Sequence, residues 1–167
     1  KPLIRKSADE GDWVVGTGSK ATGHGDKLIY AMKISKTPSF TQYWNDPVFQ
    51  QKKPFLLGSV KQAYGDNIYC KGSGGQWMQE NSHHSYEGGE PNPHNIQHDT
   101  QVDRVLISDD FVYFGGDGPI IPDALRQTLC KIGPGHKCCF TPEFITSVID
   151  WVRSLGVSGY QGKPINW

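Results

Sequence analysis

The sequence predicts an α+β protein: a small mixed or antiparallel β-barrel or sheet flanked by helices, with two helices at the C-terminal end. Apolar runs at residues 13–17 and 28–35 predict two short strands on either side of a loop rich in Gly, Lys and His. Helix signals lie instead at the two ends of the chain, before Gly11 and after Pro122. Strands that cluster centrally, with helices at the ends, are typical of an α+β fold.

Size and charge limit the classes of function. The chain has 167 residues, of which 36% are hydrophobic and 20% charged, and this composition suits one globular domain over residues 1–167. Its formal net charge is zero. A protein that wraps DNA mainly by neutralising phosphates is normally basic, so we expect any contact with nucleic acid to be local or directed at a single nucleotide.

The sequence also carries signals about location. No run approaches the roughly 18 apolar residues that span a bilayer, and no signal peptide is visible, so we expect no membrane partner. The chain begins at Lys1 without a Met, which is typical of a fragment or a processed chain. Because the cysteines show no disulfide spacing, we expect a reduced, cytoplasmic environment. These cysteines are Cys70, Cys130, Cys138 and Cys139.

The first half of the chain alternates helices and strands. Residues 2–10 predict a short helix that has Pro2 near its start and is ended by Gly11. The strands at 13–17 and 28–35 follow, and the apolar residues after them then recur at helical spacing until Pro47 interrupts the run. That run consists of Phe40, Tyr43, Trp44 and Val48.

The middle of the chain repeats one pattern and then loses regularity. Residues 64–70 repeat the Gly-Asp pair followed by a strand that opens the chain at Gly11. Residues 71–100 are rich in Gly, Ser, His, Asn and Pro, so we expect a long polar loop that serves as a lid or a binding loop. Residues 104–107 and 111–114 then predict a hairpin around the turn at 108–110.

Two helices are expected after this hairpin. The first spans about residues 122–131 and is ended by Gly133 and Pro134. The second begins after Thr141, a good N-cap, and ends at Gly156. One apolar stripe follows the second helix through Phe144, Val148, Trp151, Val152 and Leu155.

Aromatic and basic residues form the first candidate binding set. A flat base is held well between rings, because every base has a π-face that stacks at roughly 1–3 kcal/mol. The alternative is that these rings fill the core of a small sheet. Lys52 and Lys53 are candidates to bind a phosphate or carboxylate, with plain solvent exposure as the alternative. The aromatic set comprises Trp13, Tyr30, Tyr43, Trp44, Tyr69 and Trp77.

Histidines and cysteines form the second set. Histidine titrates near neutrality and serves as an acid, a base or a metal ligand, but an exposed loop explains such residues equally well. Neither the histidines nor the cysteines match a zinc motif, and the glycines at 16 and 18 lack the full dinucleotide-binding pattern, so we expect no metal and no cofactor. The residues concerned are His83, His84, His94, His98, Cys130, His136, Cys138 and Cys139.

Several ordered blocks resemble a phage and bacterial family called nucleotide modification associated domain, type two. The Gly-Asp strand, the strand after it and the Phe/Tyr/Trp segment are also similar to EVE domains, which are PUA-like readers of modified bases. The resemblance covers most of residues 1–155, and it implies a PUA-like fold and a role in systems that modify or recognise DNA bases. The matching blocks are residues 1–5, 11–18, 28–32, 40–54, 65–69, 82–83 and 103–116.

The first hypothesis is therefore recognition of a modified nucleotide, either free or as a base in DNA, in an aromatic pocket. The rings of Trp13, Trp44 and Tyr69 would stack on the base. Asn67 and Ser19 would bond base edges, whereas Lys53 and Arg104 would contact phosphate. Gly16, Tyr43 and Asp66 complete the expected ligand contacts.

Two further hypotheses stay open. The chain is alternatively an enzyme that modifies or hydrolyses a nucleotide or base, with His83 as general acid or base, supported by Asp103 or Asp66, and residues 71–100 as a lid. The third possibility is a protein-interaction domain whose aromatic residues form the core. The absence of a recognisable catalytic motif and the neutral charge favour binding over processive work on a DNA backbone.

Overall fold

The computed structural model describes residues 1–131, 133 and 135–163, and it divides the chain into two compact units. Unit 1 consists of Lys1–Glu10 and Ser35–Ile107, and unit 2 consists of Gly11–Ile34 and Ser108–Trp167. Each unit is therefore assembled from two separate stretches of sequence, and each is described on its own below.

Unit 2 is built on a four-stranded sheet with the order β1-β2-β5-β6. β2 pairs antiparallel with both β1 and β5, and β6 joins β5 in parallel. β1 and β6 form the two ends of the sheet, so the sheet is open among the described residues, and the closed barrel considered above is wrong for them. The strands are β1 (Trp13–Thr17), β2 (Leu28–Lys33), β5 (Asp110–Tyr113) and β6 (Gly159–Tyr160).

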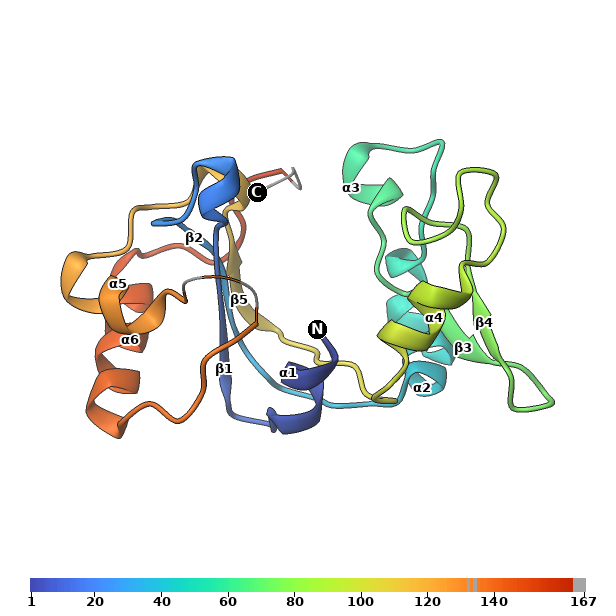
Figure 1. The fold of residues 1–167 in the computed structure, drawn as a ribbon, viewed down its shortest axis with the longest axis horizontal. Helices are drawn as coiled ribbons and strands as arrows, with labels where there is room; N and C mark the ends of the chain where they lie inside the picture. The colour runs from blue at the N-terminus through green and yellow to red at the C-terminus, as the bar shows by residue number, and fades with distance from the viewer. Residues whose placement is uncertain (132, 134, 164–167) are drawn as a thin grey trace. The chain divides into compact units, whose positions relative to one another are not determined.

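Two helices cover one side of this sheet (Figure 1). α6 (Pro142–Ser154) begins where the Thr141 hydroxyl accepts a hydrogen bond from the backbone N–H of Phe144 at 3.3 Å, as the sequence predicted. Its apolar stripe packs into the core of unit 2, where Val148 and Val152 are buried with Ala31 of the sheet. The other helices of the unit are α5 (Asp123–Leu129) and the short 3-10 helices η1 (Lys20–Thr22) and η3 (Gly115–Asp117).

Unit 1 contains short helices joined by loops, and a two-stranded sheet. Its core is aromatic: the ring of Phe40 meets Tyr69 and Trp77 edge-on, at centroid distances of 5.6 and 5.7 Å. Ile68, Ile96 and Val105 complete this core. The elements are α1 (Pro2–Ser7), α2 (Phe40–Asn45), η2 (Pro47–Lys52), α3 (Val60–Ala63), β3 (Tyr69–Lys71), β4 (Trp77–Gln79) and α4 (Pro93–Asp99).

A capping box sets the start of α2. The Ser39 hydroxyl accepts from the backbone N–H of Gln42 at 3.2 Å, while the backbone N–H of Ser39 donates to the Gln42 side chain at 2.8 Å. Pro47 ends the run of helical spacing and begins η2, whose cap is the carboxylate of Asp46. The chain therefore turns sharply directly after α2.

The α+β class, the first two strands and the two C-terminal helices are confirmed. The N-terminal helix exists but is shorter than predicted, because α1 ends at Ser7 and not at Gly11. The predicted hairpin is wrong. Residues 104–106 form no strand, Ile107 makes a single bridge to Lys36, and β5 takes β2 and β6 as its partners. Instead, the Ser108 hydroxyl donates to the backbone carbonyl of Asp110 and accepts its backbone N–H. This is a local turn, and it does not determine which strand pairs with β5.

Two other stretches differ in detail. β3 begins only at Tyr69, because residues 65–68 belong to no helix or strand. Residues 71–100 contain β4 and α4 in addition to loops. Pro134, expected to stop the helix before it, lies outside the described residues. No helix in the described part of the chain has the length and apolarity needed to cross a membrane.

Candidate functional site

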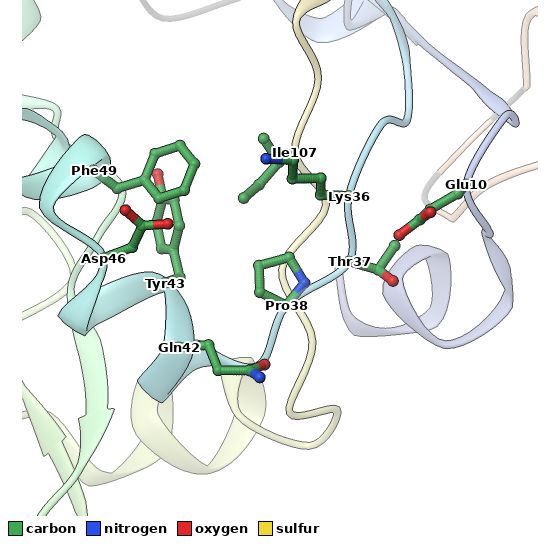
Figure 2. A pocket seen from close by; sticks show the side chains of 9 residues that line it. All are labelled: Glu10, Lys36, Thr37, Pro38, Gln42, Tyr43, Asp46, Phe49 and Ile107. Carbon is green, nitrogen blue, oxygen red and sulfur yellow. The ribbon is translucent and has the colours of Figure 1, made fainter.

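A pocket of about 380 Å³ opens in unit 1 beside α2 and η2 (Figure 2). The rings of Tyr43 and Phe49 form one wall, with centroids 4.7 Å apart and planes tilted by 40°. Pro38 and Ile107 add apolar surface. A concave site of this size, lined by rings and a few polar groups, is typical of small-molecule recognition. The remaining lining residues are Glu10, Lys36, Thr37, Gln42 and Asp46.

The polar groups of the pocket are held by the local fold. Asp46 Oδ1 accepts the backbone N–H of Val48 at 2.9 Å, which fixes the carboxylate next to the ring pair. Gln42 Oε1 is occupied by the capping box, whereas its Nε2 group makes no hydrogen bond with the described residues. Figure 2 shows the side chains of Lys36 and Ile107 extending toward the rings. The pocket thus presents carboxylates, a lysine and an amide around an aromatic wall.

A second cluster in unit 1 is organised by the carboxylate of Asp99. Its Oδ2 accepts hydrogen bonds from Tyr69 Oη at 2.8 Å and from His84 Nδ1 at 2.7 Å. Its Oδ1 accepts one from His98 Nδ1 at 3.0 Å. Since Nδ1 is the donor in each ring, the Nε2 atom of a neutral imidazole carries the lone pair. Neither Nε2 atom bonds to another described residue.

The loop before α4 fixes His84 by its backbone. The side-chain amides of Gln79 and Asn95 donate to the carbonyl of His84 at 3.2 and 2.7 Å, and the Ser82 hydroxyl accepts its N–H at 3.2 Å. The side chain of Asp99 is 19% exposed and that of His84 is 39% exposed. A sheltered carboxylate therefore orients an imidazole that solvent can reach.

Burial and hydrogen bonding act in opposite directions on this cluster. Burial on its own raises the pKa of Asp99, but the hydrogen bonds from His98, Tyr69 and His84 outweigh it and hold that pKa below its usual value. Burial, and then the bond to Asp99, raise the pKa of Tyr69, so its hydroxyl remains a donor. Burial, followed by the neighbouring His84, lowers the pKa of His83.

Among Tyr43, Trp44, Asn67 and Tyr69, all predicted to bind the ligand, only Tyr43 lies in the pocket lining. Tyr43 lines the pocket, and its Oη donates to Asp66 at 2.8 Å. The ring of Trp44 carries the ammonium of Lys53 at 3.7 Å from its centroid. By contrast, Asn67 is 1% exposed and donates to the carbonyls of Tyr43 and Phe49, and Tyr69 is 3% exposed.

The remaining predicted residues of unit 1 have partners of their own. Arg104 pairs with Asp9 at 2.7 Å. Asp103 pairs with Lys71 at 2.6 Å and accepts the backbone N–H of Phe40 at 3.0 Å, which ties it to the start of α2. His83 stacks on Tyr64, at a centroid distance of 4.7 Å, and meets His84 edge-on at 4.6 Å.

Trp13, Gly16 and Ser19 belong to unit 2. Trp13 packs against the core, with the guanidinium of Arg153 at 5.0 Å from its ring centroid. Gly16 lies opposite Tyr30, and a Cβ there would come within 2.1 Å of that ring, which explains the glycine. Ser19 caps η1 by accepting the backbone N–H of Ala21 at 3.2 Å.

Sequence reasoning missed Phe49, Asp46 and the orienting role of Asp99. The sequence carried a usable signal for the pocket, because Asp46-Pro47 marks a cap and a turn that returns Phe49 to Tyr43. No local signal links Asp99 to His84, since their contact depends on how the loop folds back on α4.

The cysteines form no disulfide among the described residues. Cys70, Cys130, Cys138 and Cys139 are free thiols, and the sulfurs of the adjacent pair are 3.6 Å apart. In residues 1–131, 133 and 135–163, no three His, Cys, Asp or Glu side chains lie so that they could hold a metal ion.

Comparison with known protein families gives a match that spans both units. The model of a family described as nucleotide modification associated domain 2 matches residues 1–167. Neither a curated protein nor a solved structure matches the chain.

Proposed function

Since the chain belongs to the nucleotide modification associated domain 2 family, we propose that unit 1 recognises a nucleotide, free or as a modified base in DNA, in the pocket beside Tyr43 and Phe49. The family description supports a nucleotide-directed role in a DNA-modification context. A PUA-like relationship, a setting in phage defence and a cytoplasmic location belong to the same proposal.

The observation that carries the proposal is the chemistry of the pocket wall. The ring pair offers an apolar π-surface, which suits the face of a base. Glu10 and Asp46 offer carboxylate oxygens, which accept hydrogen bonds from the amino and N–H groups on base edges. The lining carries two carboxylates, Glu10 and Asp46, against one lysine, Lys36, so its net negative charge suits the base of a nucleotide better than its phosphate.

A panel of nucleotides tests this proposal. Isothermal titration calorimetry should detect binding of one or more deoxynucleoside monophosphates, with the panel covering the unmodified bases, 5-methylcytosine and 5-hydroxymethylcytosine. Phe49→Leu keeps apolar volume but removes the ring, so it should weaken binding by about 1–3 kcal/mol. Tyr86→Ala removes an exposed ring of unit 1 outside the pocket and should leave the affinity unchanged. Equal loss in both variants, or no binding across the panel, would contradict the proposal.

The Asp99 cluster favours a second candidate, an enzyme acting on a nucleotide. A carboxylate that holds Nδ1–H of an imidazole leaves Nε2 free to accept a proton from an attacking water. The sequence suggested His83 as the general base. We propose its neighbour His84 instead, because His84 has the carboxylate partner.

Paired variants separate the two histidines. If this candidate holds, a nucleotide panel analysed by liquid chromatography shows turnover that His84→Gln reduces by about a hundredfold or more, while His83→Gln retains most of it. Turnover that survives in His84→Gln, or none in the wild-type chain, rules the candidate out.

A further inference from the structure

Residues 47–65 lie between α2 and β3, flanked by Asp46 and Asp66, and are locally basic in a chain with no net charge. The stretch contains Lys52, Lys53 and Lys61 and no Asp or Glu, although the whole chain has 17 residues of each sign. We call it the basic segment. A local excess of positive charge is the electrostatic feature expected of a short contact with a phosphate backbone.

The basic segment also exposes apolar and aromatic side chains. Phe55 is 55% exposed and Leu57 is 92% exposed. Single exposed apolar residues are common on protein surfaces, but several neighbouring ones often mark a binding site. The others in the segment are Val48, Leu56, Val60 and Tyr64.

Backbone hydrogen bonds hold the segment in a defined conformation. The N–H of Phe55 donates to Gln62 at 2.9 Å, and the carbonyl of Lys52 accepts the N–H of Asn67 at 3.0 Å. A capping box at Ser59 starts α3. Gly65 packs so closely on this backbone that a Cβ would come within 2.5 Å of the Lys52 carbonyl. These side chains are therefore exposed on a backbone that hydrogen bonds hold in place.

The basic segment continues directly from the pocket. Phe49, one of the two pocket rings, lies in η2, and Lys52 is the last residue of the same element. The pocket lining has two carboxylates and one lysine, whereas the segment has three lysines and no carboxylate, so we expect the base in the pocket and the phosphates along the segment. Lys53 additionally lies over the ring of Trp44, which adds an aromatic surface beside the segment.

We propose that the basic segment binds a single-stranded stretch of DNA, with Lys52, Lys53 and Lys61 at the phosphates and Phe55 stacking on a base. This inference rests on the proposed function, which it deepens: the ligand of the pocket is a base within a strand rather than a free nucleotide. Unstacked bases are required both to enter a pocket and to stack on exposed rings, which favours single-stranded over duplex DNA.

Salt dependence gives the quantitative expectation. A single strand that contacts three lysines should bind with a slope of about −2 in log affinity against log salt, because each neutralised phosphate contributes about 0.7. Affinity should then fall about 20-fold between 50 and 200 mM salt. The measurement is fluorescence anisotropy of a labelled strand of about twelve thymidine nucleotides, a length that covers one such site.

Variants locate the contact. Changing Lys52, Lys53 and Lys61 together to Gln should remove most of the salt slope, and Phe55→Ala should weaken binding at least fivefold at constant salt. A matched control changes three exposed lysines outside the segment, Lys6, Lys20 and Lys33, to Gln and should leave the slope intact.

The outcomes distinguish this inference from the proposed function. If the triple variant of the basic segment loses the strand but still binds the mononucleotide that the wild-type chain binds, both hold. Binding of mononucleotides by a chain that does not bind the strand overturns the inference alone. Equal slopes for the two triple variants, or binding only to vesicles with anionic phosphatidylserine, also overturn it, since an exposed basic and apolar surface is equally suited to a membrane.

Discussion

At the scale of single residues, the carboxylate of Asp99 organises a cluster of side chains in unit 1. It joins Tyr69 of β3, His84 of the following loop and the helical residue His98 through one carboxylate. These donors compensate for its burial, because a buried charge without partners is strongly unfavourable. The same bonds fix which nitrogen of each imidazole faces outward, so the structural role and the catalytic candidate use the same contacts.

The lowered pKa of Asp99 predicts a pH-dependent stability. Because the folded pKa lies below the ordinary value of about 3.9, the carboxylate contributes stability that is complete above that value and is lost as the pH falls through the folded pKa. The difference in free energy of unfolding between the wild-type chain and Asp99→Asn should therefore be largest near about pH 5 and shrink in more acidic solution.

Urea unfolding followed by circular dichroism measures this difference. The two proteins should have the same spectrum at about pH 5, which shows that the variant folds. A difference in free energy that stays constant down to about pH 2 would show that the carboxylate charge contributes nothing to stability.

Single residues were predicted unevenly from the sequence. Tyr43 was singled out as an aromatic residue and does line the pocket, while Tyr69, from the same set, fills the core. Both rings are buried, Tyr43 at 5% and Tyr69 at 3% exposure, and their neighbours separate them: Tyr43 meets Phe49 at the pocket, whereas Tyr69 meets Phe40 in the core. Composition predicts that rings will pack, but the three-dimensional contacts decide which face stays open.

At the scale of elements, local signals predicted helices better than strand partners. Thr141 and Gly156 mark the ends of α6 because caps act on neighbouring backbone groups. The apolar stripe through Val148 and Val152 is also a local signal, because residues four positions apart lie on the same face of a helix. These signals are readable because each involves residues only a few positions apart.

Strand pairing required information from distant residues. β5 and the apolar residues 104–107 are neighbours in sequence, yet β5 pairs with β2, about eighty residues earlier. Alternating apolar residues predict that a strand exists but carry no label for its partner. In residues 71–100 a local signal was present but was overlooked, because the whole stretch was interpreted as a loop. The Asn92 side chain caps α4 by accepting the N–H groups of His94 and Asn95.

At the scale of the whole molecule, the family resemblance was the most reliable prediction. It rested on blocks spread along the chain, and the family match over residues 1–167 confirms it. The barrel was the least reliable part, because closure depends on whether the end strands of a sheet find each other. In the described residues they do not, and the sheet order ends at β1 and β6.

The chain passes between the two compact units at more than one point, and this arrangement was invisible in the sequence. Residues 10–11, 34–35 and 107–108 are the boundaries. None of them carries a composition shift of the kind that marks a linker, so composition favoured one domain throughout. The pocket residues Glu10, Lys36 and Ile107 lie at these boundaries on the unit 1 side, and they come together only through the fold.

The most direct test of the central claim is an NMR titration of the isotope-labelled chain with the monophosphates of the panel. If a base occupies the pocket, the backbone amides of the non-proline residues from Tyr43 to Phe49 and those of Lys36 and Thr37 should show the largest chemical-shift changes, and Phe49→Leu should suppress them. Changes concentrated in the sheet of unit 2, or a spectrum that no nucleotide alters, would contradict nucleotide recognition by this pocket.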